Sequence, residues 1–149
     1  MLQNKKGIIP YTGSFENISN AFKYTKGDIL VSNIRPYLKK IWLADKDGAC
    51  STDILVINCF DKKIYPQCLY YVLSQDSFFN YMMKDKKGLK MPRGDKNSIM
   101  NYPVKCPDLQ EQIKFISFVQ SIDKQKSEAQ ERKDALIAKR YAVIEKYFK

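Results

Sequence analysis

The sequence contains no histidine, which excludes Ser-His-Asp and Cys-His nucleophilic catalysis. It also contains no glycine-rich phosphate-binding loop among its six glycines. The four cysteines form no C-x-x-C pair and show no metal-ligand spacing, so they are expected to be buried free thiols of a reducing cell. These cysteines are Cys50, Cys59, Cys68 and Cys106. We therefore expect no catalytic residue, no metal site and no cofactor.

A long hydrophobic run is also missing. A membrane-spanning helix needs about 18 or more consecutive apolar residues, and the sequence has no such stretch. The first thirteen residues, MLQNKKGIIPYTG, lack the apolar core of a signal peptide. We expect a cytoplasmic protein without a membrane partner.

Positive charge is in excess. The 26 Lys and Arg residues exceed the 16 Asp and Glu residues, for a formal net charge of +10. Such an excess favours a polyanionic partner, namely DNA, RNA or an anionic membrane face, over the alternative of a scattered surface charge. Apolar residues make up 44% of the chain, including ten Tyr and eight Phe, so a folded core is expected.

The chain divides into two parts of different texture. Residues 1–108 hold all six prolines and all six glycines, whereas residues 109–149 hold neither and form one continuous helical pattern. The first part carries 17 basic and 10 acidic residues, and the second carries 9 and 6, so both are basic. We predict a globular domain over 1–108 and one long helix over 109–149.

Residues 1–108 alternate between strand-like and helix-like stretches. Runs of branched apolar residues predict short strands. These strands are 28–34, 40–44, 53–58 and 102–106. The unbroken apolar run of 53–58 indicates burial on both faces, and Gly48 suits a positive φ in the turn before it. Helical spacing after Pro66 predicts a helix over 65–83, and 84–96 is a basic loop.

The expected fold class is therefore α+β. It consists of a small mixed β-sheet with packed helices, followed by one long C-terminal coiled-coil helix. At 1.5 Å per residue that helix would be about 60 Å long. A seven-residue repeat of apolar residues marks the seam where a second helix would pack. The seam residues are Phe115, Ile122, Ala129, Leu136 and Val143. The alternative is a helix packed back on its own domain.

Three stretches, taken in order, resemble one protein family. Lys26–Tyr37 (KGDILVSNIRPY) resembles the "GDIL…R" strand of type I restriction–modification specificity subunits. Ser51–Ile57 (STDILVI) follows it at the usual distance. Tyr102–Gln112 (YPVKCPDLQEQ) is similar to the family's "I-P-hydrophobic-P-P-L-x-E-Q" entry into a long helix. The resemblance covers roughly residues 22–149.

The resemblance implies a DNA target-recognition domain and a spacer helix. In this family the full subunit carries two recognition domains, held apart by two antiparallel helices. It tells modification (methyltransferase) subunits which bipartite DNA sequence to use. This chain resembles half of such a subunit, and the first stretch of its recognition domain is expected to be short or missing before Met1. The implied partners are double-stranded DNA, modification subunits, the restriction subunit, and a second copy or second specificity half.

Affinity for DNA comes largely from Lys and Arg at phosphates, so the basic stretches are the candidate contacts. The densest lies in the loop 84–96, where Arg93 stands between Pro92 and Gly94 and can fork onto a guanine edge. A second lies just after the 28–34 strand. The residues expected to bind DNA are Arg35, Tyr37, Lys39, Lys40, Lys84, Lys86, Lys87, Lys90, Arg93 and Lys96. The competing interpretation is a solvated loop whose lysines touch nothing.

Three residues near the end of the 28–34 strand each have two competing interpretations. Arg35 either contacts DNA or pairs with a carboxylate such as Asp28 or Asp53, and those two acids are expected mainly to cap or end turns. Tyr37 either contacts a base or sugar or, as an aromatic beside a strand, belongs to the core. Asn33 either reads an adenine or marks a bulge in its strand.

Two other functions compete with DNA recognition. A protein-interaction fragment that pairs with an intact specificity subunit would need the helix seam but no basic loop. A nuclease is suggested because Pro107-Asp108 and Glu131-Arg132-Lys133 together match a PD…ExK sequence pattern. Metal binding needs both acids within a few ångströms, whereas a continuous helix would separate them by about 35 Å. The pattern is therefore interpreted as a chance match. The chain is interpreted as a non-catalytic specificity module.

Overall fold

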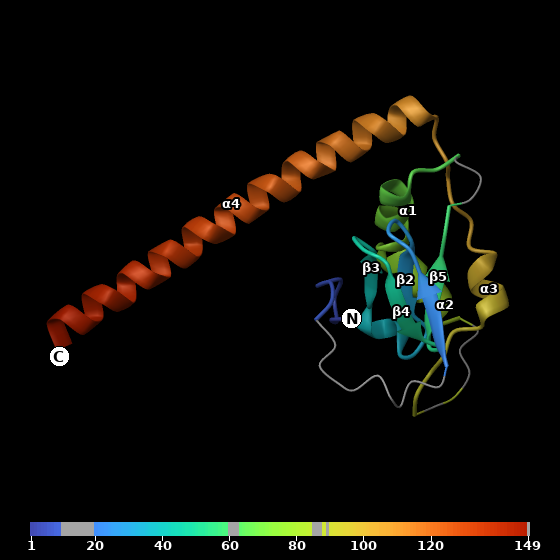
Figure 1. Ribbon diagram of the computed structural model, residues 1–149, viewed down its shortest axis with the longest axis horizontal. Coiled ribbons are helices and arrows are strands. Elements are labelled where there is room, and N and C mark those ends of the chain that lie inside the picture. Colours follow the sequence, from blue (N-terminus) through green and yellow to red (C-terminus); the bar gives the residue numbers. More distant parts are fainter. Residues whose placement is uncertain (10–19, 60–62, 85–87, 89, 149) are drawn as a thin grey trace. The chain divides into compact units, whose positions relative to one another are not determined.

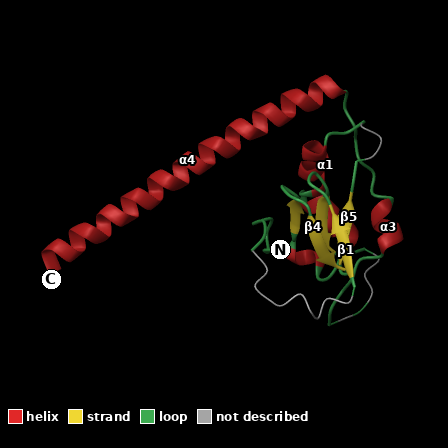
Figure 2. Ribbon diagram, viewed as in Figure 1, coloured by secondary structure: helices red, strands yellow, loops and turns green. Residues whose placement is uncertain are grey.

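A computed structural model describes residues 1–9, 20–59, 63–84, 88 and 90–148. The chain forms two compact units, Met1–Leu109 and Gln110–Lys149. Figure 1 shows both, and Figure 2 shows that the described strands all belong to the first unit. Each unit is described by itself.

A three-stranded antiparallel sheet forms the centre of the first unit, in the order β3-β2-β5. The strands are β2 (Ile29–Ser32), β3 (Ile41–Leu43) and β5 (Ile54–Ile57). In the register, Leu30 lies opposite Trp42 on one side and Val56 on the other. The predicted strands at 28–34, 40–44 and 53–58 thus exist in shortened form.

Burial is greatest on β2, not on β5. All four β2 residues are buried, because this strand has a neighbour on each side and side chains packed on each face. The prediction that the strand within 53–58 is buried on both faces is wrong. Each residue of β5 is only half-buried, since the strand lies at the end of the sheet order.

A two-stranded antiparallel sheet pairs β1 (Ala21–Tyr24) with β4 (Gly48–Ser51). Gly48 does not have a positive φ, contrary to the prediction. It leaves room for the ring of Tyr24, whose Cζ would lie 2.6 Å from any Cβ at this position. That ring meets Trp42 edge-on at 5.7 Å between centroids. A small apolar cluster of Leu30, Trp42 and Ala44 is covered there by half-buried residues that include Tyr24.

The predicted helix over 65–83 is two helices, α1 (Pro66–Leu73) and α2 (Asp76–Met82). Pro66 stands in the first turn of α1, as expected. The backbone turns out of the helix at Gln75, which has an extended ψ of 152°. The break lets both helices reach the same core.

That core lies on the Ile29 and Val31 face of the sheet. It joins Leu69 and Leu73 of α1, three residues of α2 and one of α3 (Lys96–Met100) to the strands. The α2 and α3 residues are Phe78, Phe79, Met82 and Ile99, each no more than 4% exposed. The α+β class is confirmed, but in place of the expected mixed sheet the described residues form two sheets whose strand pairings are all antiparallel.

The predicted strand over 102–106 is absent, since residues 102–108 have no strand assignment. Pro103 has no backbone N–H to donate to a ladder. The N–H of Tyr102 instead bonds back to the carbonyl of Ile99 at 3.1 Å. The Tyr102 ring packs edge-on against Phe78 and Tyr81, with 5.0 Å between centroids in each case. This segment is thus fixed by its aromatic side chain.

The second unit is the helix α4 (Leu109–Phe148), 40 residues long. At 1.5 Å per residue it measures about 60 Å. Large apolar side chains stand exposed along it, among them Leu136 at 65% and Val143 at 55%. None of the helices in the described part of the chain is long and apolar enough to cross a membrane.

Candidate nucleic-acid interface

Three segments distant in sequence meet just beyond the carboxyl end of the central strand β2. The Asn33 N–H donates to the carbonyl of Asp53 at 2.8 Å, and the Arg35 N–H donates to the carbonyl of Pro92 at 2.8 Å. Ile34 and Arg93 form an isolated antiparallel bridge. The end of the 84–96 loop is therefore fixed to the continuation of β2, although Ile34 and Arg93 are 59 positions apart in sequence.

Arg93 is one of the exposed residues of this junction. Pro92 and Gly94 on either side are buried, whereas Arg93 itself lies at the surface. Its Nε donates to Oδ1 of Asp53 at 3.2 Å, and the two side chains remain 48% and 41% exposed. A rigid backbone thus presents one arginine together with one carboxylate.

A groove of about 460 Å³ lies beside Arg93. Its lining residues are Asn33, Gly88, Met91, Arg93, Gly94, Asp95, Lys96 and Asn97. Asn33 is 5% exposed, and its Oδ1 has no hydrogen-bond partner among the described residues. Asp95 caps α3 by accepting from the N–H groups of Asn97 and Ser98 at 3.1 Å, which places Lys96 at the start of that helix. The groove therefore combines two cations and the carboxylate of Asp95 with a buried amide.

Gly94 is needed for this close approach. A Cβ there would lie 3.1 Å from both Oδ1 of Asn33 and the carbonyl oxygen of Met82, and 2.7 Å from Cδ1 of Ile99. We expect Gly94→Ala to lower the free energy of unfolding by about 1–2 kcal/mol, because small-to-large changes in packed sites force neighbours apart. Urea denaturation would measure the loss. Asn97→Ala, at an exposed position of α3, is the control and should cost under about 0.5 kcal/mol. Equal losses in the two variants would contradict the packing argument.

Arg35 and Tyr37 lie next to this junction and are exposed, Tyr37 by 49%. Arg35 precedes the 3-10 helix η2 (Pro36–Leu38) with a left-handed backbone, φ 50° and ψ 63°. Neither of its expected carboxylate partners forms an ion pair with it in the described part of the chain. Asp28 accepts from the N–H and the hydroxyl of Thr25 at 2.8 and 3.1 Å and so closes a turn, and Asp53 holds Arg93. The interpretation of Tyr37 as a core residue is wrong, because it stands among the exposed large side chains.

Lys39 has a partner within its own domain. Its Nζ lies 2.8 Å from Oδ2 of Asp76 at the start of α2, and Lys5 reaches the other oxygen at 3.5 Å. The hydrogen bond from Lys39 lowers the pKa of the Asp76 carboxyl below its ordinary value. The charge of Lys39 is thus already compensated, so it is a weaker candidate for a phosphate contact than Arg93 or Lys96.

The remaining predicted contacts are spread over the loop and β3. Lys84, Lys90 and Lys96 are exposed, and Nζ of Lys84 lies 5.4 Å from the centre of the Tyr81 ring. Lys40 is half-buried just before β3. Lys86 and Lys87 lie outside the described residues. No group of three or more Cys, Asp or Glu side chains among the described residues could hold a metal ion.

Sequence reasoning did not find the Asp53–Arg93 pair or the Asp76 contacts. Forty residues separate Asp53 from Arg93, and 37 separate Lys39 from Asp76. No local spacing signals such contacts, because they depend on how the loop and the helices return to the sheet.

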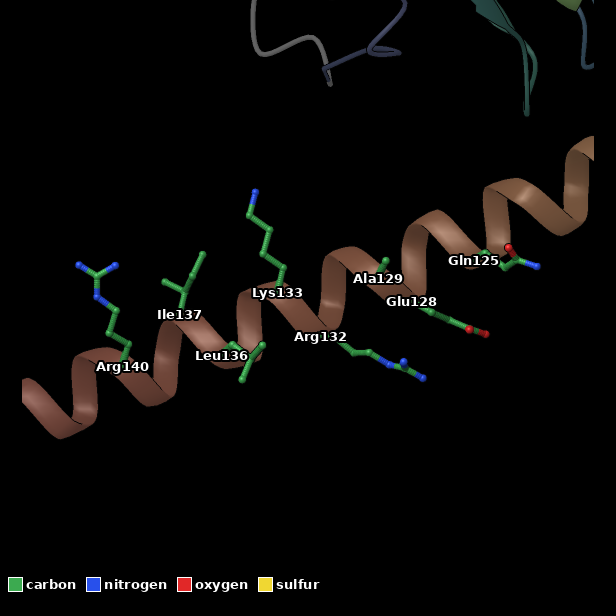
Figure 3. A pocket seen from close by; sticks show the side chains of 8 residues that line it. All are labelled: Gln125, Glu128, Ala129, Arg132, Lys133, Leu136, Ile137 and Arg140. Atoms are coloured by element: carbon green, nitrogen blue, oxygen red, sulfur yellow. The ribbon is translucent and has the colours of Figure 1, made fainter.

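The predicted seam residues of the second unit all lie on α4. A hollow of about 630 Å³ runs along the middle of this helix, and Figure 3 shows the eight side chains that line it. They are Gln125, Glu128, Ala129, Arg132, Lys133, Leu136, Ile137 and Arg140. All eight come from one exposed helix, so this is open space between neighbouring side chains, of which Ala129, Leu136 and Ile137 are apolar. Such a face suits a second helix better than a small ligand.

A small α+β unit followed by one long helix defines the general class of this chain, and comparison with known proteins identifies its family. Residues 2–139 match the family described as type I restriction modification DNA specificity domain. The chain belongs to that family.

Three relatives illustrate the match. The type I restriction enzyme EcoDI specificity subunit of Escherichia coli is 29% identical over 100 residues, which are 67% of this chain and 22% of the relative. The crystal structure of the HsdS subunit from Thermoanaerobacter tengcongensis is 27% identical with a TM-score of 0.60, over 82% of this chain and 34% of that one. A structure reported for complex assembly and conformational transition of the type I R-M system is 28% identical with a TM-score of 0.63, over 85% and 35%. The chain thus spans about a fifth to a third of the length of these relatives.

Proposed function

We propose that this chain reads one part of a bipartite DNA target for a type I restriction–modification complex. Lys84, Lys90 and Lys96 bind phosphates, and Arg93 contacts a base edge in the major groove. The observation that carries the proposal is the exposed Arg93, held beside a groove by a loop fixed to the sheet, in a chain of a DNA-specificity family.

The chain contributes recognition and no chemistry of its own. Methyl transfer and cleavage belong to the modification and restriction subunits that it directs. The helix α4 pairs with a second copy of this chain or with a second specificity half. As a rod of fixed length it would set the spacing between two bound half-sites, as dimer geometry does in other DNA readers. An antiparallel pair of copies would present two inverted recognition units and read a palindromic bipartite site.

Co-purification with a type I modification subunit, followed by methylation mapping of the host DNA, tests this proposal. We expect a complex that methylates one bipartite sequence, and the two halves of that sequence are inverted copies if α4 pairs with itself. A stable complex that adds no methyl groups would reject the directing role. A target with two unrelated halves would indicate that the partner of α4 is a different specificity half.

The second candidate is an interaction fragment that binds an intact specificity subunit through α4 without reading DNA. The exposed apolar side chains along α4 favour it, because a helix seam of this kind can pair without any basic loop. A chain that pulls down an intact specificity subunit but binds duplex DNA no better than an uncharged protein would establish it.

A further inference from the structure

A carboxylate on a surface that binds phosphates needs an explanation. Asp53 is 41% exposed and lies 3.2 Å from the Nε of Arg93, where its charge would repel the DNA backbone and lower affinity for every sequence. Its backbone is also fixed, since the carbonyl of Asp53 accepts from the N–H of Asn33 at 2.8 Å. Both ends of the ion pair therefore start from backbone that is anchored to the sheet.

The atom that Asp53 uses is informative. An arginine carries one N–H on Nε and four on its two terminal nitrogens, in a planar fork. Because Asp53 holds the Nε edge, the plane of the guanidinium is oriented and the terminal pair is left for a ligand. Two parallel N–H donors match the O6 and N7 acceptors that only guanine presents in the major groove.

We propose that Asp53 is a positioning residue that aims Arg93 at a guanine, and that it increases base preference at the expense of general affinity. This inference rests on the proposed DNA-reading function. An ion pair that merely fastened the loop would add little, because the pair is about half exposed and the backbone bridge between Ile34 and Arg93 already joins the loop to the sheet.

Binding of the full 149-residue chain to a pool of random-sequence duplexes, with sequencing of the bound fraction, tests the inference. Asp53→Asn should raise affinity for unselected DNA severalfold, because a negative charge is removed. The same variant should lower the preference for guanine at one position of the selected site by about tenfold, because Arg93 loses its orientation. A rise in affinity for unselected DNA together with a fall in guanine preference distinguishes a positioning role from a purely electrostatic effect.

Three further variants complete the test. Arg93→Lys keeps the charge but loses the fork, so the guanine preference should fall by about tenfold with little change in general affinity. The double variant Asp53→Asn with Arg93→Lys should lose no more preference than Arg93→Lys alone, since Asp53 acts through Arg93. Asp45→Asn removes an exposed carboxylate from the loop before β4 and should leave the guanine preference unchanged.

Unchanged base preference in Asp53→Asn, or preference losses that simply add in the double variant, would overturn the inference while leaving the DNA-reading function intact. A wild-type chain that enriches no sequence from the pool and binds no duplex would instead overturn the proposed function. Circular dichroism and urea denaturation of each variant show whether a lost preference reflects a lost fold.

Discussion

A quadruple variant in which glutamine replaces Lys84, Lys90, Arg93 and Lys96 should bind duplex DNA on the order of 100-fold more weakly at about 0.1 M salt. Each phosphate contact adds roughly 0.9 to the slope of log affinity against log salt, so the slope should become shallower by about 3. Arg93 is assigned to a base, and its loss adds to the affinity change. Fluorescence anisotropy across a salt titration would measure both quantities.

The matched control removes the same number of charges elsewhere in the first unit. Glutamine at Lys26, Lys46, Lys63 and Lys105 also lowers the formal charge from +10 by four. Its affinity should fall only a few-fold, because charges far from the interface act through a screened field. Equal losses in the two variants would mean that the positive charge is scattered and that no localised interface exists.

Strands with a strong local signal could be predicted from sequence. The ILVS of β2 and the ILVI of β5 are rich in branched residues, and both were expected. The AFKY of β1 and the GACS of β4 carry no such signal, and their pairing joins segments more than 20 residues apart. A strand that depends on its partner more than on its own side chains cannot be found by composition.

The candidate site likewise contains one residue that the sequence predicts and one that it does not. Arg93 could be singled out because it stands between a proline and a glycine in a basic loop. Its carboxylate partner could not, because Asp53 meets it only after the loop has formed its bridge to Ile34. The residue type of Gly48 predicts a role in a turn, whereas its importance comes from the space that it leaves for the ring of Tyr24. Residue type predicts chemistry at a site, but the contacts that orient it are set by packing.

The apolar seam of α4 leads to the second large expected effect, which concerns association. Ile122 and Leu136 are 38% and 65% exposed and lie two heptads apart on one helix. Replacing both with glutamate would put two charges into a paired apolar seam, where unpaired charges are costly. We expect the chain to form dimers at micromolar concentration and the double variant to dissociate at least about 100-fold more readily, measured by sedimentation equilibrium.

Gln120→Glu with Ala138→Glu provides the matched control for this effect. Each position is two residues from a seam residue, so it lies on the opposite side of the helix, and the two substitutions again introduce two glutamates. Glutamate is also a good helix former, so α4 should remain helical in both variants. The control should therefore dimerise like the wild type. A wild-type chain that stays monomeric at high micromolar concentration would reject self-pairing, and the seam would then require a different specificity half as its partner.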